Sequence, residues 1–397
     1  MTSSGGPPTV ETIAAAAGVS IASVSRVLNG HGARPDTVRR VEQAAAELGY
    51  VPNKVARSLK GGRTRQLTFA MPDIGNPAYV SMVRQIQAVT KPLGYRLLLH
   101  STDAVAKDEL DVVRSLADRT SDGLIICPIR VTEEHLAALT TASGPVVVIG
   151  SLPQGARVDS VRADSVSGAV LAVRHLVALG RRRIAFVNGP ADTVPGANRA
   201  AGYRTALAAA GLAVNEALTV TTDFSVEAGA AAAHRLLDAG LGIDSVFCAN
   251  DQLALGAAHA AQDRGLRIPE DLAVVGMDDS ELARAGHPAL TSVDLGSGER
   301  GRLAAQMLVA RLEGGAPATG SGDAAGVGRV TVAPRLVVRA STGGAGAASA
   351  DAGTRGDRAA RCVPAGPGHS GARTGAPPTA ARERTPDAST ACAGSTI

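Results

Sequence analysis

The feature that most constrains the fold is a regular alternation of short apolar runs and helical patterns between about residues 66 and 340. Strands of buried parallel sheets read as near-continuous apolar runs, and intervening amphipathic stretches read as helices. The alternation therefore predicts one helix-covered parallel sheet, or two of them. Because aromatic residues make up only 2% of the chain, the core must consist of Val, Leu, Ala and Ile. The predicted strands are QLTFAMP, YRLLLHS, DGLIICP, PVVVIGS, VDSVRAD, RRIAFVNGP, SVFCAN and DLAVVGMDD.

Polar side chains follow these runs at the carboxyl ends of the predicted strands, where open α/β sheets bind ligands. No nucleophile accompanies them, so they resemble hydrogen-bonding partners for a polyhydroxylated ligand more than a catalytic set. The candidates are Asp73, Asn76, Arg130, Asp164, Asn250 with Asp251, and Asp278 with Asp279.

The sequence lacks the common catalytic and nucleotide-binding motifs of α/β proteins. MPDIGNPAY stands where a GxGxxG loop would follow the first strand, and GxxxxGK[ST], GxSxG and HExxH are absent. The four Cys residues show neither CxxC spacing nor a partner His at metal-ligand spacing. This pattern indicates reduced thiols. We therefore expect no cofactor, no metal and no catalysis, with a sugar-processing enzyme as an alternative that strand-end carboxylates would allow.

Positive charge is concentrated at the start of the chain. Residues 1–65 hold nine Lys and Arg residues against four Asp and Glu residues, whereas the whole chain carries a net charge of +4. A basic head on a slightly acidic body is typical of a nucleic-acid-binding module joined to another domain. A solvated basic surface is the alternative that charge alone leaves open.

Three short helices are predicted in this head. Thr9 caps residues 10–18, Gly18 ends that helix, and Ser20 caps residues 21–29. Two short helices joined by a turn that contains Gly predict a helix-turn-helix whose second helix contacts DNA. A third helix is predicted over residues 36–49, with Pro35 where a Ser or Thr would cap best.

A short basic segment follows the third helix. Asn53 can cap a helix of barely two turns that ends at Gly61 and Gly62 and carries Leu59 among Lys and Arg residues. One interpretation is a hinge helix that folds on DNA and inserts Leu59 between base pairs of the minor groove. The other interpretation is a plain basic linker.

The head resembles the LacI/GalR family of bacterial transcription regulators. The resemblance rests on AAAAGVSIASVSRVLNG followed by TVRRVEQAAAELGYVPNKVARSLKGG, and it extends over roughly residues 9–340. It implies that Ile21 and Ala22 occupy variable base-reading positions, with Arg26 as the third major-groove contact. It places Leu59 as the intercalating residue, with Asn53 and Ala56 in the hinge helix. Phosphate-binding or helix-orienting roles are implied for Ser20, Ser23, Ser25 and Asn29.

The body resembles the periplasmic-binding-protein-like core of the same family. PDIGNPAYVSMVRQI matches its opening segment, in which Tyr79 is expected to contact the effector. GPADTVPGANRAAGYRTAL matches the stretch that supplies a ligand-binding arginine, here Arg199. ANDQLALGAAHAAQDRGLRIPEDLAVVGMDDSELA implies Asn250 and Asp278 as cleft residues. Phe224 falls where an aromatic ring often stacks on a sugar, although ordinary core packing is equally compatible. Leu295 departs from the family, which usually has a polar residue there.

The predicted fold is an all-α helix-turn-helix head with a hinge helix, joined to a two-lobed α/β core with parallel sheets. The head takes residues 1–62 and the effector-binding and dimerisation core takes residues 63–340. Lobe one is expected at about 66–163 and 296–325, and lobe two at about 164–295 and 329–340. Residues 341–397, rich in Ala, Gly, Pro and Arg, are predicted to be a disordered tail.

These patterns predict a dimeric, cytoplasmic transcriptional repressor of carbohydrate-utilisation genes. One expected partner is a pseudo-palindromic double-stranded DNA operator, and the family resemblance implies a CG step at its centre. The other is a sugar-like effector that either releases the repressor from the operator or loads the repressor onto it. We expect no membrane association, because the sequence shows no signal peptide and no long apolar stretch. A sugar-binding transport receptor is the alternative, but it would leave the basic head unexplained.

Overall fold

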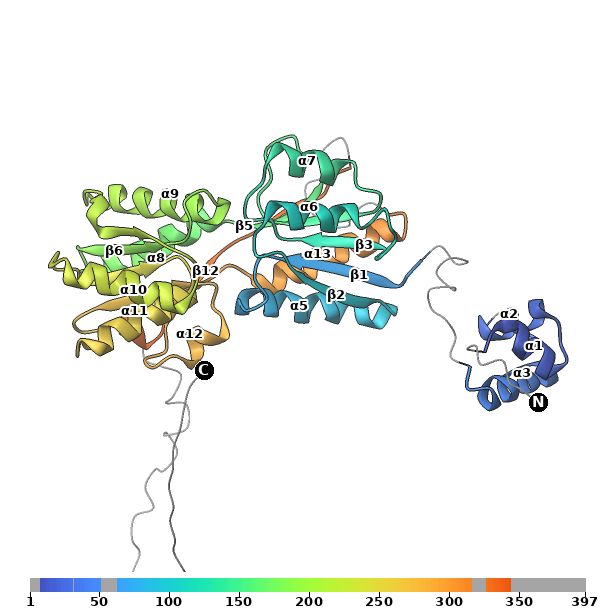
Figure 1. Ribbon diagram of the computed structural model, residues 1–397. Helices are drawn as coiled ribbons and strands as arrows, with labels where there is room; N and C mark the ends of the chain where they lie inside the picture. Colours follow the sequence, from blue (N-terminus) through green and yellow to red (C-terminus); the bar gives the residue numbers. More distant parts are fainter. Residues whose placement is uncertain (1–7, 31, 51–62, 316–325, 344–397) are drawn as a thin grey trace, which may run out of the picture. The chain divides into compact units, whose positions relative to one another are not determined.

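The computed structural model describes residues 8–30, 32–50, 63–315 and 326–343 (Figure 1). The predicted hinge segment with Asn53, Ala56 and Leu59 lies outside the described residues, as do residues 344–397 of the predicted tail. Within the described ranges no single helix is long and apolar enough to cross a membrane. The first two helices reach that length and apolarity only together, and they bend by 108° where they meet.

The head contains three helices, α1 (Val10–Ala17), α2 (Ile21–Leu28) and α3 (Pro35–Glu47). The predicted caps are confirmed: the Thr9 side chain accepts a hydrogen bond from the backbone N–H of Thr12, and Gly18 takes a left-handed conformation with φ 61°. Ile13, Val24 and Val41 are fully buried and form the centre of a small core. The guanidinium of Arg40 donates to the carbonyl of Gly18 at 2.8 Å, which ties the turn to α3.

Pro35 occupies the first turn of α3 rather than its cap. The N-cap is Arg34, which makes no side-chain capping bond. Proline is well suited to the first helical position, because the N–H that it lacks would have no partner inside the helix. The absence of a Ser or Thr cap at this site is therefore compensated in part by the proline itself.

The first lobe is built on a six-stranded sheet of order β11-β5-β4-β3-β1-β2, and all of its neighbouring strands are parallel. Figure 1 shows α5 and α13 along one face and α6 and α7 along the other, each pair with its own hydrophobic cluster. The strands are β1 (Gln66–Met71), β2 (Arg96–Ser101), β3 (Gly123–Ile126), β4 (Val146–Ile149), β5 (Asp159–Ala163) and β11 (Arg329–Val332). The helices are α5 (Pro77–Thr90), α6 (Ala106–Arg114), α7 (Glu133–Thr140) and α13 (Ser297–Leu312).

The second lobe has a six-stranded sheet of order β12-β10-β9-β8-β6-β7, in which only β12 runs antiparallel to its neighbour. Both faces pack into one large core of Ala, Val and Leu with a stack of Phe186, Tyr203 and Phe247. The strands are β6 (Ile184–Asn188), β7 (Thr219–Thr221), β8 (Ser245–Cys248), β9 (Ala273–Met277), β10 (Thr291–Asp294) and β12 (Arg335–Val337). The helices are α8 (Ser165–Ala178), α9 (Val194–Ala209), α10 (Val226–Asp238), α11 (Asp251–Asp263) and α12 (Glu281–Ala285).

The last strands divide between the two lobes differently from the prediction. Residues 329–340 were all expected in lobe two, but β11 pairs with β5 in the first sheet and only β12 joins the second. Pro334 lies between them, and a proline cannot donate to a strand ladder. This stretch therefore forms two short strands, and the third crossing between the lobes lies between β11 and β12 rather than before residue 329.

Candidate DNA-reading helix and effector pocket

Helix α2 is fixed at both ends by its own polar side chains. The Ser20 hydroxyl accepts a hydrogen bond from the backbone N–H of Ser23 at 3.1 Å, and the two hydroxyls lie 2.9 Å apart. The Asn29 amide donates to the carbonyl of Ser25 at 2.7 Å. These four residues, predicted to bind phosphates or to orient the helix, therefore all take part in holding the ends of α2.

The other predicted DNA contacts within α2, Ile21, Ala22 and Arg26, lie on its solvent-exposed face. Val24 is fully buried, whereas Ile21 is 51% exposed and Ala22 and Arg26 are also exposed. Arg26 forms no hydrogen bond or ion pair with any other residue of the described head. Its guanidinium is thus available for an external partner, and a bidentate guanine contact is the kind of partner that it suits.

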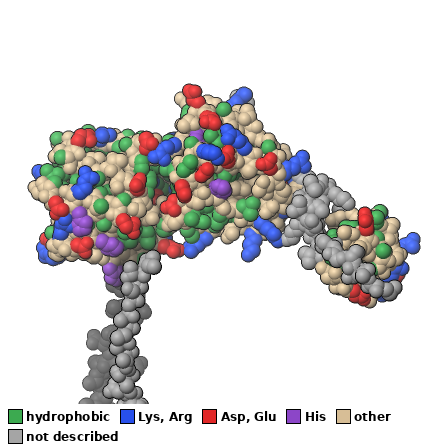
Figure 2. All heavy atoms as spheres, in the orientation of Figure 1, with side chains coloured by type: hydrophobic (Ala, Val, Ile, Leu, Met, Phe, Trp, Pro, Cys, Tyr) green, Lys and Arg blue, Asp and Glu red, His purple; other side chains and the backbone are tan. Residues whose placement is uncertain are grey.

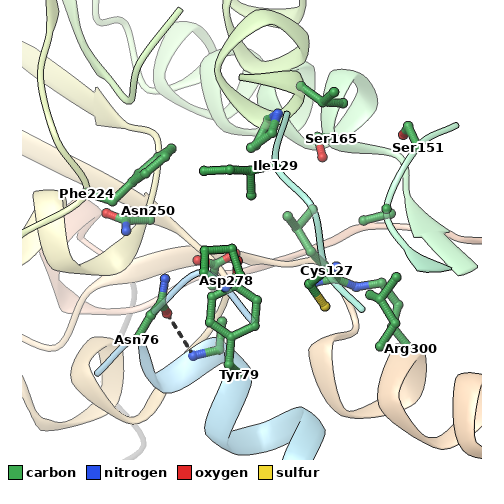
Figure 3. Close-up of a pocket in the computed structure, with 18 of the residues that line it drawn as sticks. Asn76, Tyr79, Cys127, Ile129, Ser151, Ser165, Phe224, Asn250, Asp278 and Arg300 are labelled. Atoms are coloured by element: carbon green, nitrogen blue, oxygen red, sulfur yellow. Dashed lines mark hydrogen bonds between the residues drawn. The ribbon is translucent and has the colours of Figure 1, made fainter. Parts of the chain in front are cut away.

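A pocket of about 140 Å³ lies between the two lobes, at the carboxyl ends of both sheets (Figure 3). Groups from both lobes line it, and Figure 3 shows Phe224 and Asn250 on one side with Cys127 and Ser151 on the other. The predicted effector-binding residues found there are Asp73, Asn76, Tyr79, Arg199, Phe224, Asn250 and Asp278.

Two predicted effector-binding residues do not line this pocket. Arg130 forms an exposed, bidentate ion pair with Asp192, at 2.7 and 3.1 Å. Asp164 is the N-cap of α8, where its carboxylate accepts hydrogen bonds from the backbone N–H of Ser167 at 3.0 Å and from its hydroxyl at 2.7 Å. Both side chains follow strands as predicted, but Arg130 is paired with the distant Asp192 and Asp164 caps its own helix, and neither lines the pocket.

The polar centre of the pocket is a buried pair of opposite charges. A guanidinium nitrogen of Arg199 lies 3.7 Å from a carboxylate oxygen of Asp278, and both side chains are less than a tenth exposed. Burial raises the pKa of Asp278 and lowers the pKa of Arg199, and each charge opposes the effect of burial on the other. Within the described residues the Nε of Arg199 donates no hydrogen bond. The pair can therefore offer both a donor and an acceptor to a hydroxylated ligand.

Asn250 and Phe224 complete this side of the pocket. The Asn250 side chain caps α11 by accepting from the backbone N–H of Leu253 at 2.8 Å. Its amide nitrogen lies 3.5 Å from the side-chain oxygen of Gln252, which occupies one of its two N–H groups and leaves the other as a donor near the cavity. The Phe224 ring packs against the second-lobe core and also lines the pocket, with the guanidinium of Arg199 5.8 Å from the ring centroid. The two interpretations of Phe224 are therefore compatible. Gly189 makes room for the ring, since a Cβ there would lie 2.0 Å from it.

Several groups that line the pocket were not among the predicted effector-binding residues. Leu295 does lie there, so the departure from the family pattern puts an apolar side chain against the cavity. Burial raises the pKa of the Cys127 thiol to about 12, which keeps it protonated at neutral pH. Arg300 comes from the first turns of α13, a helix that was not predicted. The other missed residues include Ile129, Ser151, Ser165, Val194 and Asn198.

Asp251 supports the pocket from behind. It is 2% exposed and accepts hydrogen bonds from the backbone N–H of Ser280 at 2.7 Å and from the hydroxyl of Ser292 at 2.6 Å. Burial, and then the charge of Asp278, raise the pKa of Asp251 to about 7. These bonds hold the segment that carries Asp278, whose own φ of 107° is unusual for a residue with a side chain.

The raised pKa of Asp251 predicts a loss of stability with rising pH. The folded state retains this proton to a higher pH than the unfolded chain does, so the stabilisation is complete below pH ~4 and is lost as the pH rises through about 7. Burial raises the pKa of Glu109 to about 7 as well, which adds the same trend. We expect the urea midpoint to fall between pH 5.5 and pH 8, and Asp251→Asn to flatten that fall. An equal slope in both proteins would contradict the assignment.

The comparisons with known proteins agree with this architecture. Residues 9–53 match the family described as bacterial regulatory proteins, lacI family, and residues 173–342 match the periplasmic binding protein-like domain. Catabolite control protein A of Priestia megaterium is 34% identical over 76% of this chain and 91% of its own. The HTH-type transcriptional regulator CelR of Thermobifida fusca is 35% identical over 77% of this chain and 92% of its own.

Two solved structures are similar to this chain over most of its length. The CelR–cellobiose complex is 34% identical, with a TM-score of 0.62 over 84% of this chain and 99% of that one. The lac repressor dimer bound to operator and the anti-inducer ONPF is 28% identical, with a TM-score of 0.74 over 85% of this chain and 99% of that one.

A helix-turn-helix head and a two-lobed core with a pocket between its lobes define a DNA-binding transcriptional regulator. The chain belongs to the lacI family of bacterial regulatory proteins.

Proposed function

We propose that this protein is a dimeric repressor of carbohydrate-utilisation genes, released from or loaded onto a pseudo-palindromic operator by a sugar-like effector. One observation carries the proposal: a pocket lined by both lobes combines the Arg199–Asp278 pair, the Asn250 amide and the Phe224 ring. These groups suit a sugar, because hydroxyls need paired donors and acceptors while an apolar ring face needs a flat partner. The relatives bound to cellobiose and to ONPF support it.

The head is the region that supports DNA binding. Arg26 is an exposed cation without a partner among the described residues, on a helix whose ends are fixed by their own caps. On the face of the core shown in Figure 2, acidic and basic side chains are interspersed rather than gathered by sign. The proposed division of labour is therefore DNA contact through the head and effector contact through the core.

Strand β1 provides the physical link between the pocket and the segment that leads to the head. Just before it begins, the Asp122 carboxylate accepts hydrogen bonds from the backbone N–H groups of Thr64 and Arg65, at 2.6 and 2.9 Å. Beyond its other end lie Pro72 and Asp73, which line the pocket. A shift of the first lobe around an effector would therefore move the start of the head segment with it.

An effector acts on such a system only through different affinities for its states. Two ion pairs between the lobes bear on that equilibrium: Arg84 on α5 pairs with Glu281 on α12 at 2.6 Å, and Arg130 pairs with Asp192 at 2.7 Å. Their side chains are exposed to solvent, so these ion pairs contribute little by themselves and can break as the lobes move. Contacts inside the pocket must supply most of the difference in free energy between the two states.

Arg199→Met should abolish the response to the effector while leaving operator affinity near that of the wild type. The buried guanidinium is the donor that a sugar hydroxyl would meet, and the variant should weaken effector binding at least about tenfold. The measurement is operator affinity by fluorescence anisotropy, with and without each member of a sugar panel.

Arg204→Met is the matched control, because Arg204 lies on the same helix, is exposed and pairs with Glu216 at 3.3 Å. It should respond like the wild type. Loss of both operator binding and effector response in Arg199→Met would show that Arg199 supports folding, and an undiminished response would refute its role in the effector site.

A further inference from the structure

Arg300 is a charged group in the pocket that the proposed function does not yet explain. Its half-buried side chain lines the cavity, and Figure 3 shows it on the side away from Phe224 and Asn250. Its guanidinium donates to the Ser297 hydroxyl at 3.1 Å, a neutral group. Within the described ranges it forms no ion pair with a carboxylate, and its buried Nε donates no hydrogen bond.

No carboxylate forms an ion pair with Arg300 among the described residues, because each carboxylate near the pocket has partners of its own. Burial raises the pKa of Asp278, and the charges of Arg199 and then of Arg300 oppose that rise. Asp278 faces Arg199 at 3.7 Å, and the exposed Asp73 accepts a hydrogen bond from the backbone N–H of Gly75 at 2.7 Å. Those behind the pocket are held by other groups: Asp251 by Ser280 and Ser292, Asp279 by Arg339, and Asp294 by Arg335.

Four charged side chains therefore line the pocket, Arg199 and Arg300 against Asp73 and Asp278. Asp278 lies next to Arg199 and Asp73 is exposed, so no carboxylate forms an ion pair with Arg300 among the described residues. A half-buried charge without an ion-pair partner is stabilised when an opposite charge comes to lie beside it. A planar guanidinium with free N–H groups suits an oxyanion, which it can bind through charge-assisted hydrogen bonds.

The size of the pocket limits the ligand. Its volume of about 140 Å³ is close to that of an engineered protein cavity that holds one benzene molecule. Leu295 and Phe224 add apolar surface to the lining. A single ring therefore fits this cavity better than two linked rings.

We propose that the effector is a single-ring polyhydroxylated molecule with one oxyanion, a carboxylate or a phosphate, that binds Arg300. Its hydroxyl groups would face Arg199 and Asp278, and its ring would lie against Phe224. This inference rests on the proposed effector site, but it makes a separate claim about charge. A neutral sugar would leave Arg300 without an ion-pair partner.

The test is isothermal titration calorimetry on the full chain with matched neutral and acidic ligands. The panel is glucose, glucuronate and the phosphate ester of glucose at its primary hydroxyl, the corresponding galactose compounds, and inorganic phosphate. At least one acidic sugar should bind about tenfold to a hundredfold tighter than its neutral parent. Comparison of the uronate with the phosphate ester identifies which oxyanion the site takes.

Arg300→Met should remove this preference, whereas Arg300→Lys should retain part of it and so separate charge from folding. Arg302→Met is the control, because Arg302 lies on the same helix but pairs with Glu299 and does not line the pocket. Tighter binding of neutral sugars would overturn the inference while sustaining the proposed function. The inference would also be overturned if no anion in the panel bound in a way that depends on Arg300. In that case the operator titration would still test the proposed regulatory function separately.

Discussion

Arg26→Ala is expected to weaken binding to the operator by about 1–3 kcal/mol per half-site, the range for a bidentate contact to a base. The reason is that Arg26 projects from a helix with fixed ends and has no partner within the described head. Its exposed neighbours Ile21 and Ala22 can offer only apolar contacts, so the choice of base should depend heavily on the guanidinium. The variant should therefore lose preference for the operator as well as affinity.

The measurement is the ratio of affinities for the operator duplex and a scrambled duplex at fixed salt. Arg39→Ala is the control, since Arg39 is an exposed arginine on α3 that pairs with Asp36. It should leave the ratio unchanged. Equal weakening of Arg26→Ala on both duplexes would show that Arg26 contacts only phosphates, which carry no sequence information.

Gly256→Ala is expected to destabilise the core by about 1–3 kcal/mol and to weaken effector binding with it. A Cβ at Gly256 would lie 2.0 Å from the carbonyl oxygen of Val226 and 2.5 Å from the backbone nitrogen of Ala230. Both are backbone atoms of α10, so α10 and α11 would have to move apart. Phe224 lies just before α10 and Asn250 caps α11, and the shift would separate two sides of the pocket.

Thermal unfolding and calorimetry with the effector identified from the panel would measure these two effects. His259→Ala, exposed on the same helix, should leave both values near those of the wild type. Wild-type stability in Gly256→Ala would contradict the close packing of the two helices. Reduced stability with wild-type effector affinity would show that this packing does not position the pocket.

Most of the sheet framework was predictable because buried parallel strands are continuous apolar runs. β1, β3, β4 and β6, for example, were recognisable as QLTFAMP, DGLIICP, PVVVIGS and RRIAFVNGP. β7 has only three residues, and β10 reads TSVD, so neither carries a run long enough to identify. α13 begins with SGERG, whose glycines and charges hide its helical periodicity.

The pocket was predictable only where strand ends determine it. Asp73, Asn250 and Asp278 follow strands whose carboxyl ends meet at the cavity, so their positions along the chain were sufficient. Arg130 also follows a strand, but its distant partner Asp192 holds it elsewhere. Arg300 reaches the cavity because the chain recrosses between the lobes before α13. Such tertiary placement leaves no local signal in the sequence.

The central claim is that the head binds a specific palindrome and that the core controls this binding. The most direct test titrates the full chain against a CG-centred palindrome, selected from a library for binding, and a scrambled duplex at several salt concentrations. The account predicts tighter binding to the palindrome, a steep salt dependence and a shift in affinity with at least one sugar of the panel. Equal binding to both duplexes at every salt concentration, unaffected by any sugar, would contradict it.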